Sequence, residues 1–384
     1  MIRSNEKSMR LLMFAMLTEL NASSRVMCYQ FAPYLKAVGI KTTICSPSSK
    51  ILYQLCNRTP VNFLDRIAVA LLYRFYWYLW APLRRLVFIS SIPLYDVIFI
   101  QRGMLQHCWK PWLEMLTYRW AKIWRKKVIY AFDDPIYLDC PTYMKSVIEK
   151  ADAVFTYAEA LVDYSLQYNP KVFLLEPGVD LERYPLRDST ASRKNRKIVI
   201  GWVGNSMVGF RYLKQLYEPL RRLFQKYPNL IFRVVSGRDF RFDKKGVPVE
   251  NVRWRLDYEA SATFDIGLIP LTESDYDKAK ISFKLLQYWA HGIPVVCSQT
   301  ADTCLEDEVN CLIVKKPEDW VEKLSLLIEQ PTLRKKLGDN GRRLIETRFS
   351  LEVQGMIFAN CIKDVVEGSI RLRESEDTMP ESNS

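Results

Sequence analysis

The sequence predicts an α/β protein built from two domains, each a parallel sheet flanked by helices. One observation is the length, because 384 residues are enough for two domains with separate cores. Another lies beyond residue 264, where an apolar run (266–271), an acidic loop, a helix (282–291) and a second apolar run (294–298) follow one another. The same strand–helix–strand order recurs near the N-terminus, and it is typical of parallel sheets.

The composition narrows the class of protein. A hydrophobic content of 49% and an aromatic content of 13% exclude a disordered chain. The net charge of +12 favours an anionic partner such as nucleic acid, acidic lipid or nucleotide phosphate. No continuous basic stripe or recognised module is visible, so nucleic acid is not expected. Nine scattered cysteines without a CxxC pair, and only two histidines, indicate a reducing compartment and no zinc site.

The first domain is expected over residues 1–186. Its first strand is predicted at 11–17, because the apolar run is short and lacks the small-residue cleavage site of a signal peptide. This favours a cytoplasmic protein. A helix at 26–38, ended by Gly39, and a strand at 41–45 complete a Rossmann-like opening. Since there is no GxGxxG motif, a dinucleotide site is not expected.

Three polar residues lie between the first strand and the first helix, namely Ser23, Ser24 and Arg25. Loops in this position face the ligand in Rossmann-like domains. The three residues are therefore candidate contacts to an acceptor or to a donor phosphate. An alternative is equally good: a serine caps the helix and the arginine lies in its solvated first turn.

The stretch 63–94 is unusually apolar and aromatic. Arg74 interrupts the apolar run and Pro82 breaks it, which argues against a transmembrane span. Amphipathic aromatic residues with arginines suit a helix that lies in a membrane interface. A helical pair buried in the first domain, with its arginines reaching outward, fits equally well. A second basic and aromatic run, 118–127, favours the membrane surface.

Further strands of the first sheet are predicted at 95–101 and 127–132, and the second of these runs into Asp133, Asp134 and Pro135. Two carboxylates at the carboxyl end of a strand lie where active-site loops gather. One of them could orient or deprotonate an acceptor hydroxyl. The other interpretation is a helix N-cap followed by proline at the first helical position. Because the pair is not a DxD motif, no metal is inferred from it.

A polar segment without apolar periodicity, 187–197, is the predicted linker, and the second domain is expected over 198–349. It opens with a strand at 197–203. The loop 204–206 follows directly, and a helix is predicted at 212–224. A short helix over 257–262 comes later.

Lysines mark the start of the helix at 282–291. Lys280, Lys284 and Gln287 are spaced i, i+4 and i+7, so they share one helix face. Cations at a helix N-terminus that follows the carboxyl end of a strand bind anions well. The pattern therefore predicts a phosphate or diphosphate ligand. An ordinary lysine face exposed to water would show the same spacing.

The runs IGLIPL (266–271) and KISFKLLQYWAHGIPVVCS (280–298) resemble the donor-binding segment of family-four glycosyltransferases. The strand, the helix, the AxG turn and the PVV strand stand in the same order. The resemblance is strong over about 197–350 and looser before. It implies the GT-B fold, with two Rossmann-like domains facing a central cleft and a last helix, 350–368, crossing back to the first domain. The tail, 369–384, is expected to be disordered.

By this resemblance the protein is a retaining enzyme, of the hexosyltransferase type, that uses a nucleotide-diphosphate sugar and requires no metal. Lys280 and Lys284 would hold the diphosphate, whose charge grows as the glycosidic bond breaks. Asp133 and Asp134 would face the acceptor across the cleft. The candidate donor contacts are Gly204, Asn205, Ser206, Arg211, Lys214, Tyr258, Glu259, Glu273, Ser282 and Gln287.

The sequence departs from the family pattern in two places. Many members carry an arginine where this chain has Asn205, and Arg211 or Lys214 would have to supply that charge. The two glutamates that are common in the family, eight residues apart, correspond here to Ala279 and Gln287. A catalytically degenerate GT-B scaffold in an envelope-assembly complex is therefore the alternative function.

The basic and aromatic runs of the first domain guide the prediction of the acceptor. They favour a lipid-linked or cell-envelope polysaccharide acceptor and peripheral association with an anionic membrane. The expected location is the cytoplasm, with peripheral binding to the inner face of the plasma membrane.

Overall fold

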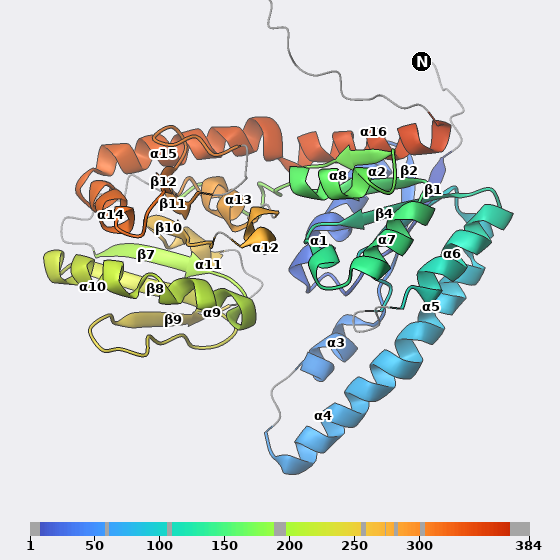
Figure 1. Cartoon of the computed structure of the whole chain (residues 1–384), viewed down its shortest axis with the longest axis horizontal. Helices are drawn as coiled ribbons and strands as arrows, with labels where there is room; N and C mark the ends of the chain where they lie inside the picture. The colour runs from blue at the N-terminus through green and yellow to red at the C-terminus, as the bar shows by residue number, and fades with distance from the viewer. Residues whose placement is uncertain are drawn as a thin grey trace, which may run out of the picture.

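The structure is a computed structural model that describes residues 8–57, 61–105, 110–187, 197–254, 259–272, 274–279, 283–299 and 304–368. The described chain forms two six-stranded sheets, and the strands pair in parallel within each. The two sheets lie side by side and helices flank both of them (Figure 1). The predicted fold class is confirmed.

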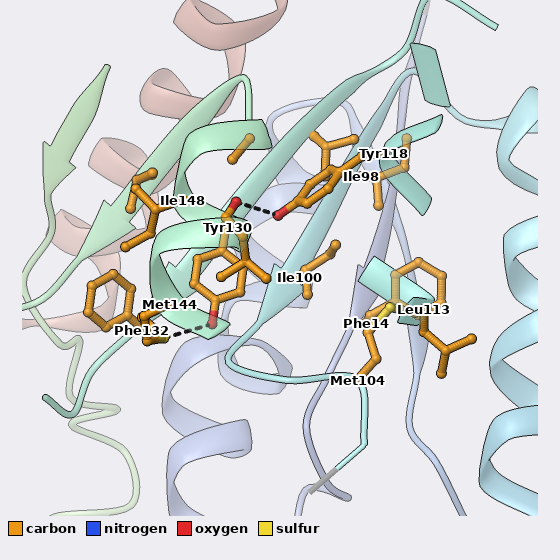
Figure 2. Packing of buried hydrophobic residues seen from close by; sticks show 14 of the residues in the cluster. Phe14, Ile98, Ile100, Met104, Leu113, Tyr118, Tyr130, Phe132, Met144 and Ile148 are labelled. Atoms are coloured by element: carbon orange, nitrogen blue, oxygen red, sulfur yellow. Dashed lines mark hydrogen bonds between the residues drawn. The ribbon is translucent and has the colours of Figure 1, made fainter. Parts of the chain in front are cut away.

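The first sheet has the strand order β2-β1-β3-β4-β5-β6. Its central strands β3, β4 and β5 are buried on both faces, as is typical of parallel sheets, and Figure 2 shows the core on one face, where Tyr130 and Phe132 of β4 pack beside Met144. Its elements are β1 (Met9–Phe14), α1 (Ala22–Met27), α2 (Ala32–Ala37), β2 (Ile40–Cys45), α3 (Lys50–Asn57), α4 (Phe63–Phe75), α5 (Ala81–Ser90), β3 (Val97–Gln101), α6 (Trp112–Ile123), β4 (Lys127–Phe132), α7 (Pro141–Lys150), β5 (Ala153–Thr156), α8 (Glu159–Leu166) and β6 (Val172–Leu174).

The second sheet has the order β12-β11-β10-β7-β8-β9. Trp202 and Phe232 are buried on one face, and Tyr288 and Trp289 on the other. Its elements are β7 (Ile198–Val203), α9 (Ser206–Lys214), α10 (Tyr217–Lys226), β8 (Leu230–Ser236), β9 (Val249–Arg253), α11 (Glu259–Ala262), β10 (Ile266–Ile269), α12 (Asp275–Lys278), α13 (Phe283–Ala290), β11 (Val295–Ser298), β12 (Leu312–Val314), α14 (Asp319–Glu329) and α15 (Pro331–Leu344).

Two predicted helices and one predicted loop differ from the structure. The helix predicted at 26–38 begins earlier, at Ala22, and is broken at Cys28, after which Pro33 stands in the first turn of α2. The helix predicted at 212–224 begins at Ser206 and divides into α9 and α10. The acidic loop before α13 contains the short helix α12, because Ser274 caps it by accepting a hydrogen bond from the Asp277 N–H.

The last helix, α16 (Leu351–Glu367), lies against the first sheet, so the predicted crossing back is confirmed (Figure 1). The ring of Phe358 stacks on Phe31 with centroids 4.7 Å apart and meets Phe99 edge-on at 5.6 Å. At the crossing itself, the Arg348 guanidinium pairs with the Glu176 carboxylate. The predicted linker lies almost wholly outside the described residues, and only Arg187 and Lys197 of it are described.

A helical arm extends from the first domain and projects below both sheets in the view of Figure 1. It consists of α4, the π-helical turn Tyr76–Trp80, and α5. Pro82 does not break this helix, contrary to the prediction: it follows the π-helical turn, and the helix continues to Ser90. The alternative of a buried helical pair is wrong for α4, which has no buried residue. Among the described residues, no helix combines the length and the apolar character that crossing a membrane requires.

Candidate functional site

Each sheet has a switch point, where the strand order reverses around the first strand of its domain. In the first sheet it lies between β1 and β3, and in the second between β7 and β10. Open α/β sheets bind ligands at the carboxyl ends of the strands beside such a point. The segments that follow these four strands therefore define the candidate site.

The turn after β7 is packed onto the indole of Trp202. A Cβ atom would lie 2.7 Å from that ring at Gly204 and 2.4 Å at Gly209, so α9 can approach the ring this closely only with glycine at both positions. The N–H of Val203 donates to the Tyr288 hydroxyl at 3.0 Å. The Trp202 ring of the strand itself and Tyr288 of α13 thus fix the strand-to-helix turn.

Lys284 lies in the first turn of α13, and its ammonium is above the Trp202 ring. The Nζ atom is 4.8 Å from the ring centroid, within the range of a cation–π interaction. Its Cε atom is 2.9 Å from the point where a Cβ of Gly204 would lie. The buried side chains of Leu286 and Trp289 fix α13 to the sheet. The structure therefore brings Lys284 and Gly204 together, at the carboxyl end of β7.

Arg211 and Asp277 meet through Tyr212, close to the same turn. The Arg211 guanidinium donates to the Tyr212 hydroxyl at 2.5 Å, and that hydroxyl donates to Asp277 Oδ1 at 2.5 Å. The Thr272 N–H donates to the other Asp277 oxygen at 3.1 Å. Burial would raise the pKa of Asp277, but hydrogen bonds from Thr272, Tyr212 and Ser274 outweigh burial and lower it. Asp277 is therefore an anion that ties α12 to α9.

In the first domain, Asp133 and Asp134 share one arginine, Arg102. Its Nε lies 2.5 Å from Asp133 Oδ1, and its Nη2 pairs with Asp134. The Ser23 hydroxyl donates to Asp133 Oδ2 at 2.8 Å and accepts from the Gln101 side chain at 2.9 Å. The carboxyl ends of β1, β3 and β4 are thus joined by one polar network.

This network changes the pKa of the Arg102 guanidinium. Burial lowers the pKa of the Arg102 guanidinium, but the charges and hydrogen bonds of Asp133 and Asp134 outweigh burial, and the pKa is raised. Its backbone is left-handed, with φ +56.

The N-cap interpretation of the segment 133–135 is wrong, because Pro135 is the cap of the following 3-10 turn and no side chain caps it.

Ser24 and Arg25 have structural partners in the first domain. The Ser24 hydroxyl is buried and donates to Gln101 Oε1 at 3.0 Å. Arg25 is almost fully buried and donates to the Glu19 carbonyl at 3.3 Å. Neither serine is the N-cap that the alternative interpretation proposed, because Asn21 caps α1.

The two domains approach each other near α12. Ala279 is buried in the apolar core of the first domain that also contains Ile136. Burial, and after it the negative charge of Asp275, raises the pKa of Tyr137. The segment after β10 therefore faces the segment after β4, which carries the acidic pair.

A narrow crevice between the domains is lined by Arg25, Val26, Gln30, Asp180, Arg183, Tyr184 and Phe283. It brings α1 close to the first residue of α13. Beside it, the Gln287 side chain donates to the Tyr184 hydroxyl at 2.8 Å. Gln287 thus contacts the connection between the domains.

A wider hollow lies over the carboxyl ends of β10, β11 and β12. Thr272, Ser298 and Gln299 line it, together with three lysines, Lys278, Lys315 and Lys316. Its charge is suited to an anion. The edge of the second sheet that bears Gly204 thus continues into a basic surface.

The remaining predicted residues differ in their placement. Asn205 is exposed in the turn before α9, and Ser206 begins that helix. Lys214 is exposed and pairs with Asp243 at 3.4 Å. Lys280, Tyr258, Glu273 and Ser282 lie outside the described residues, as does the Glu259 side chain. In the part of the chain that is described, no group of three His, Cys, Asp or Glu side chains could hold a metal ion.

Arg102, Trp202 and Tyr212 belong to the candidate site, and the sequence interpretation did not identify them. Trp202 stands within a strand, where an aromatic residue reads as core. Tyr212 stands in a helix and bonds Asp277, which is distant in sequence. The only signal for Arg102 is its position directly after a buried strand and before Gly103.

The comparisons with known proteins agree with this architecture. Residues 211–354 match a family model described as "Glycosyl transferase-like". HepE of Anabaena, solved in complex with UDP-glucose, has a TM-score of 0.63 at 13% identity, over 93% of this chain and 100% of that chain. A search of curated protein sequences gave no match.

Two further solved structures are similar over nearly the whole chain. Sucrose-phosphate synthase of Thermosynechococcus elongatus has a TM-score of 0.62 at 14% identity, over 94% of this chain and 100% of that chain. A glycosyltransferase of Rickettsia africae has a TM-score of 0.63 at 14% identity, over 95% and 100%. The chain therefore has the GT-B fold, with two Rossmann-like domains.

Proposed function

We propose that the protein is a glycosyltransferase that moves a sugar from a nucleotide-diphosphate sugar to an acceptor. The observation that carries this proposal is Lys284, whose ammonium lies over Trp202 beside Gly204 at the switch point of the second sheet. A diphosphate seated there would meet a cation and the start of α13. The neighbours support this donor class, since HepE was crystallised with UDP-glucose and with UDP.

The chemistry is mainly electrostatic. Negative charge develops on the leaving diphosphate as the glycosidic bond breaks, and a fixed cation stabilises that state more than the ground state. Lys280, by its spacing from Lys284, is the second proposed cation. The resemblance to family four carries over the rest: transfer with retention, no metal, and an acceptor that attacks from the face the diphosphate leaves.

The first domain is the proposed acceptor side. Ser23 and the carboxylates of Asp133 and Asp134 lie at the carboxyl edge of its sheet, and the two carboxylates belong to the segment that faces α12. They would orient the acceptor hydroxyl. The proposed acceptor is a lipid-linked or cell-envelope polysaccharide, and the proposed location is the cytoplasmic face of the plasma membrane.

The donor site is tested by the thermal shift of the purified protein with UDP, GDP, CMP and their sugars. One nucleotide diphosphate is expected to raise the Tm, and Lys284→Ala is expected to abolish the shift because the diphosphate loses its cation. In a turnover assay with the matching sugar, the same substitution should lower the rate about 10²–10³-fold.

The matched control is Lys336→Ala, which removes an exposed lysine from α15. It should keep the full shift and the full rate. If Lys284→Ala keeps the shift as well, the donor does not bind on α13. The anomeric configuration of the product, read by nuclear magnetic resonance, tests retention.

The second candidate function is a scaffold without catalysis. It is favoured by Ala279 and Gln287, which replace two acids common in the resembled family, and by the bond of Gln287 to Tyr184. A scaffold would neither respond to any nucleotide nor hydrolyse a nucleotide sugar. Hydrolysis that depends on Lys284 would exclude it.

A further inference from the structure

The arm exposes an unusual amount of apolar surface. None of the thirteen residues of α4 is buried, although ten of them are apolar or aromatic. Leu64 of this helix and Val61 just before it are each more than three-quarters exposed. A soluble protein rarely leaves an apolar surface of this extent uncovered, and such surfaces mark binding sites.

The exposed side chains form one row. Every fourth residue from 63 to 87 is apolar, and these seven residues are between 44% and 74% exposed: Phe63, Ile67, Leu71, Phe75, Leu79, Leu83 and Val87. Four residues advance an α-helix by one turn plus about 40°, so such a row drifts around a straight helix. The π-helical turn Tyr76–Trp80 rotates the chain less per residue and offsets part of that drift. Over the six steps from 63 to 87 the drift would be about 240° in a plain α-helix, and the π turn removes about 100° of it, so the row forms a broad stripe over less than half of the arm's circumference.

The charges of the arm are arranged around this row. Asp65 is the only acidic residue between 63 and 90, against four arginines. Since successive residues turn by about 100°, Asp65 and Arg66 lie on the side of α4 away from the row. Arg74 is exposed at its flank. Among the rings near the body, Tyr78 is 80% exposed and Trp80 41%.

This pattern fits a lipid surface. A membrane interface accepts a long, convex, apolar row without needing a complementary groove, and its acidic headgroups attract Arg74 at the flank of the row. Tyrosine and tryptophan prefer the headgroup level, where one edge of the ring is apolar and the other is wet. The net charge of +12 also favours binding to an acidic lipid surface.

The root of the arm is fixed to the candidate site. The buried Arg85 donates to the carbonyls of Ala15 and Cys45, at the ends of β1 and β2, and to Met104 just after β3. Tyr76 and Trp77 pack with Met16 and Leu17 in the loop that leads to Ser23. The arm is thus joined rigidly to the edge that carries the acidic pair.

We infer that the arm docks the protein onto an acidic lipid surface, with α4 lying in the interface along its apolar row. The inference stands on the arm and does not depend on the donor chemistry. It also brings the acceptor side of the proposed active site close to the membrane.

The test is flotation of the full chain with two kinds of vesicle: phosphatidylcholine alone, and an equal mixture of phosphatidylcholine and phosphatidylglycerol. The protein should float with the mixed vesicles and much less with the neutral ones. The double variant Leu71→Glu/Phe75→Glu should lower partition more than about tenfold, because two apolar side chains of the row become charged.

The control is Leu166→Glu/Met356→Glu, which makes the same change at exposed positions on α8 and α16. It should float like the unmodified protein. Both double variants should keep their Tm and their shift with the nucleotide, so that a loss of flotation is separate from a failure of donor binding. Three outcomes would overturn the inference. The protein could fail to float with the mixed vesicles, it could float equally with both vesicle types, or the arm variant could float normally. A dimer in solution that only the arm variant dissociates would also overturn it, since the row would then bind a second copy.

Discussion

Arg102 determines how the acidic pair of the first domain is presented. Both carboxylates contact its guanidinium, and all three side chains are less than a quarter exposed. Two adjacent anions at a strand end repel each other, and a shared cation between them offsets that repulsion. The pair that the sequence predicted as an acceptor group is therefore one part of a three-residue unit.

Replacing Arg102 by methionine should lower the free energy of unfolding by about 2–4 kcal/mol. Breaking a buried ion pair costs about 3–5 kcal/mol, and the partial exposure of this one reduces that cost. Arg125→Met is the matched control, because Arg125 is also left-handed, with φ +52, but is exposed. Denaturant unfolding would compare the two, and equal effects would show that the carboxylates do not need their arginine.

At the level of elements, the strands could be predicted closely, while the helices and several partners could not. The strand at 127–132 coincides with β4, because a continuous apolar run marks a buried strand, and the strand at 41–45 agrees with β2 within one residue. The break at Cys28 and the division between α9 and α10 depend on tertiary contacts that periodicity does not contain. Within the candidate site, Lys284 and Gly204 could be predicted from the local sequence, because one stands at the start of a helix and the other directly after a strand.

Helix α9 depends on its contact with the indole below it. Gly209→Ala should destabilise the protein by about 1–3 kcal/mol and weaken nucleotide binding, because its Cβ would lie 2.4 Å from the Trp202 ring. The control is Gly237→Ala, whose Cβ would meet only the Ser206 hydroxyl, at 3.9 Å. Thermal unfolding with and without nucleotide gives both readouts. Unchanged values for Gly209→Ala would show that α9 is free to shift.

At the level of the whole molecule, α16 is late in the sequence but belongs to the core of the first domain. Phe358→Ala should cost about 3–5 kcal/mol, and mainly in that domain, because its ring fills the space between Phe31, Phe99 and Phe155. Met356→Ala, on the exposed side of the same helix, should change stability by less than about 0.5 kcal/mol.

Hydrogen exchange would locate the effect of Phe358→Ala. Protection should fall in β1, β3 and β5 and persist in β7, β8 and β10. A uniform loss across both sheets would mean that the two domains unfold as a single unit. The crossing helix was predictable from the family resemblance, while the exposure of α4 was not, because an apolar pattern does not reveal what covers it.

The π-helical turn of the arm fixes the rotation of α4 relative to α5 about their common helix axis. Its five residues cover about the rotation of four residues of an α-helix, so if the same residues were α-helical, α4 would be turned by about 100° about its axis and the arm would be about 1.5 Å longer. Phe63, Ile67 and Leu71 would then face a different side from Leu83 and Val87. The composition, charge and length of the arm would barely change, yet its two halves could no longer lie on one plane. The one extra residue that the π-helical turn Tyr76–Trp80 accommodates thus decides which way the whole molecule faces a flat surface.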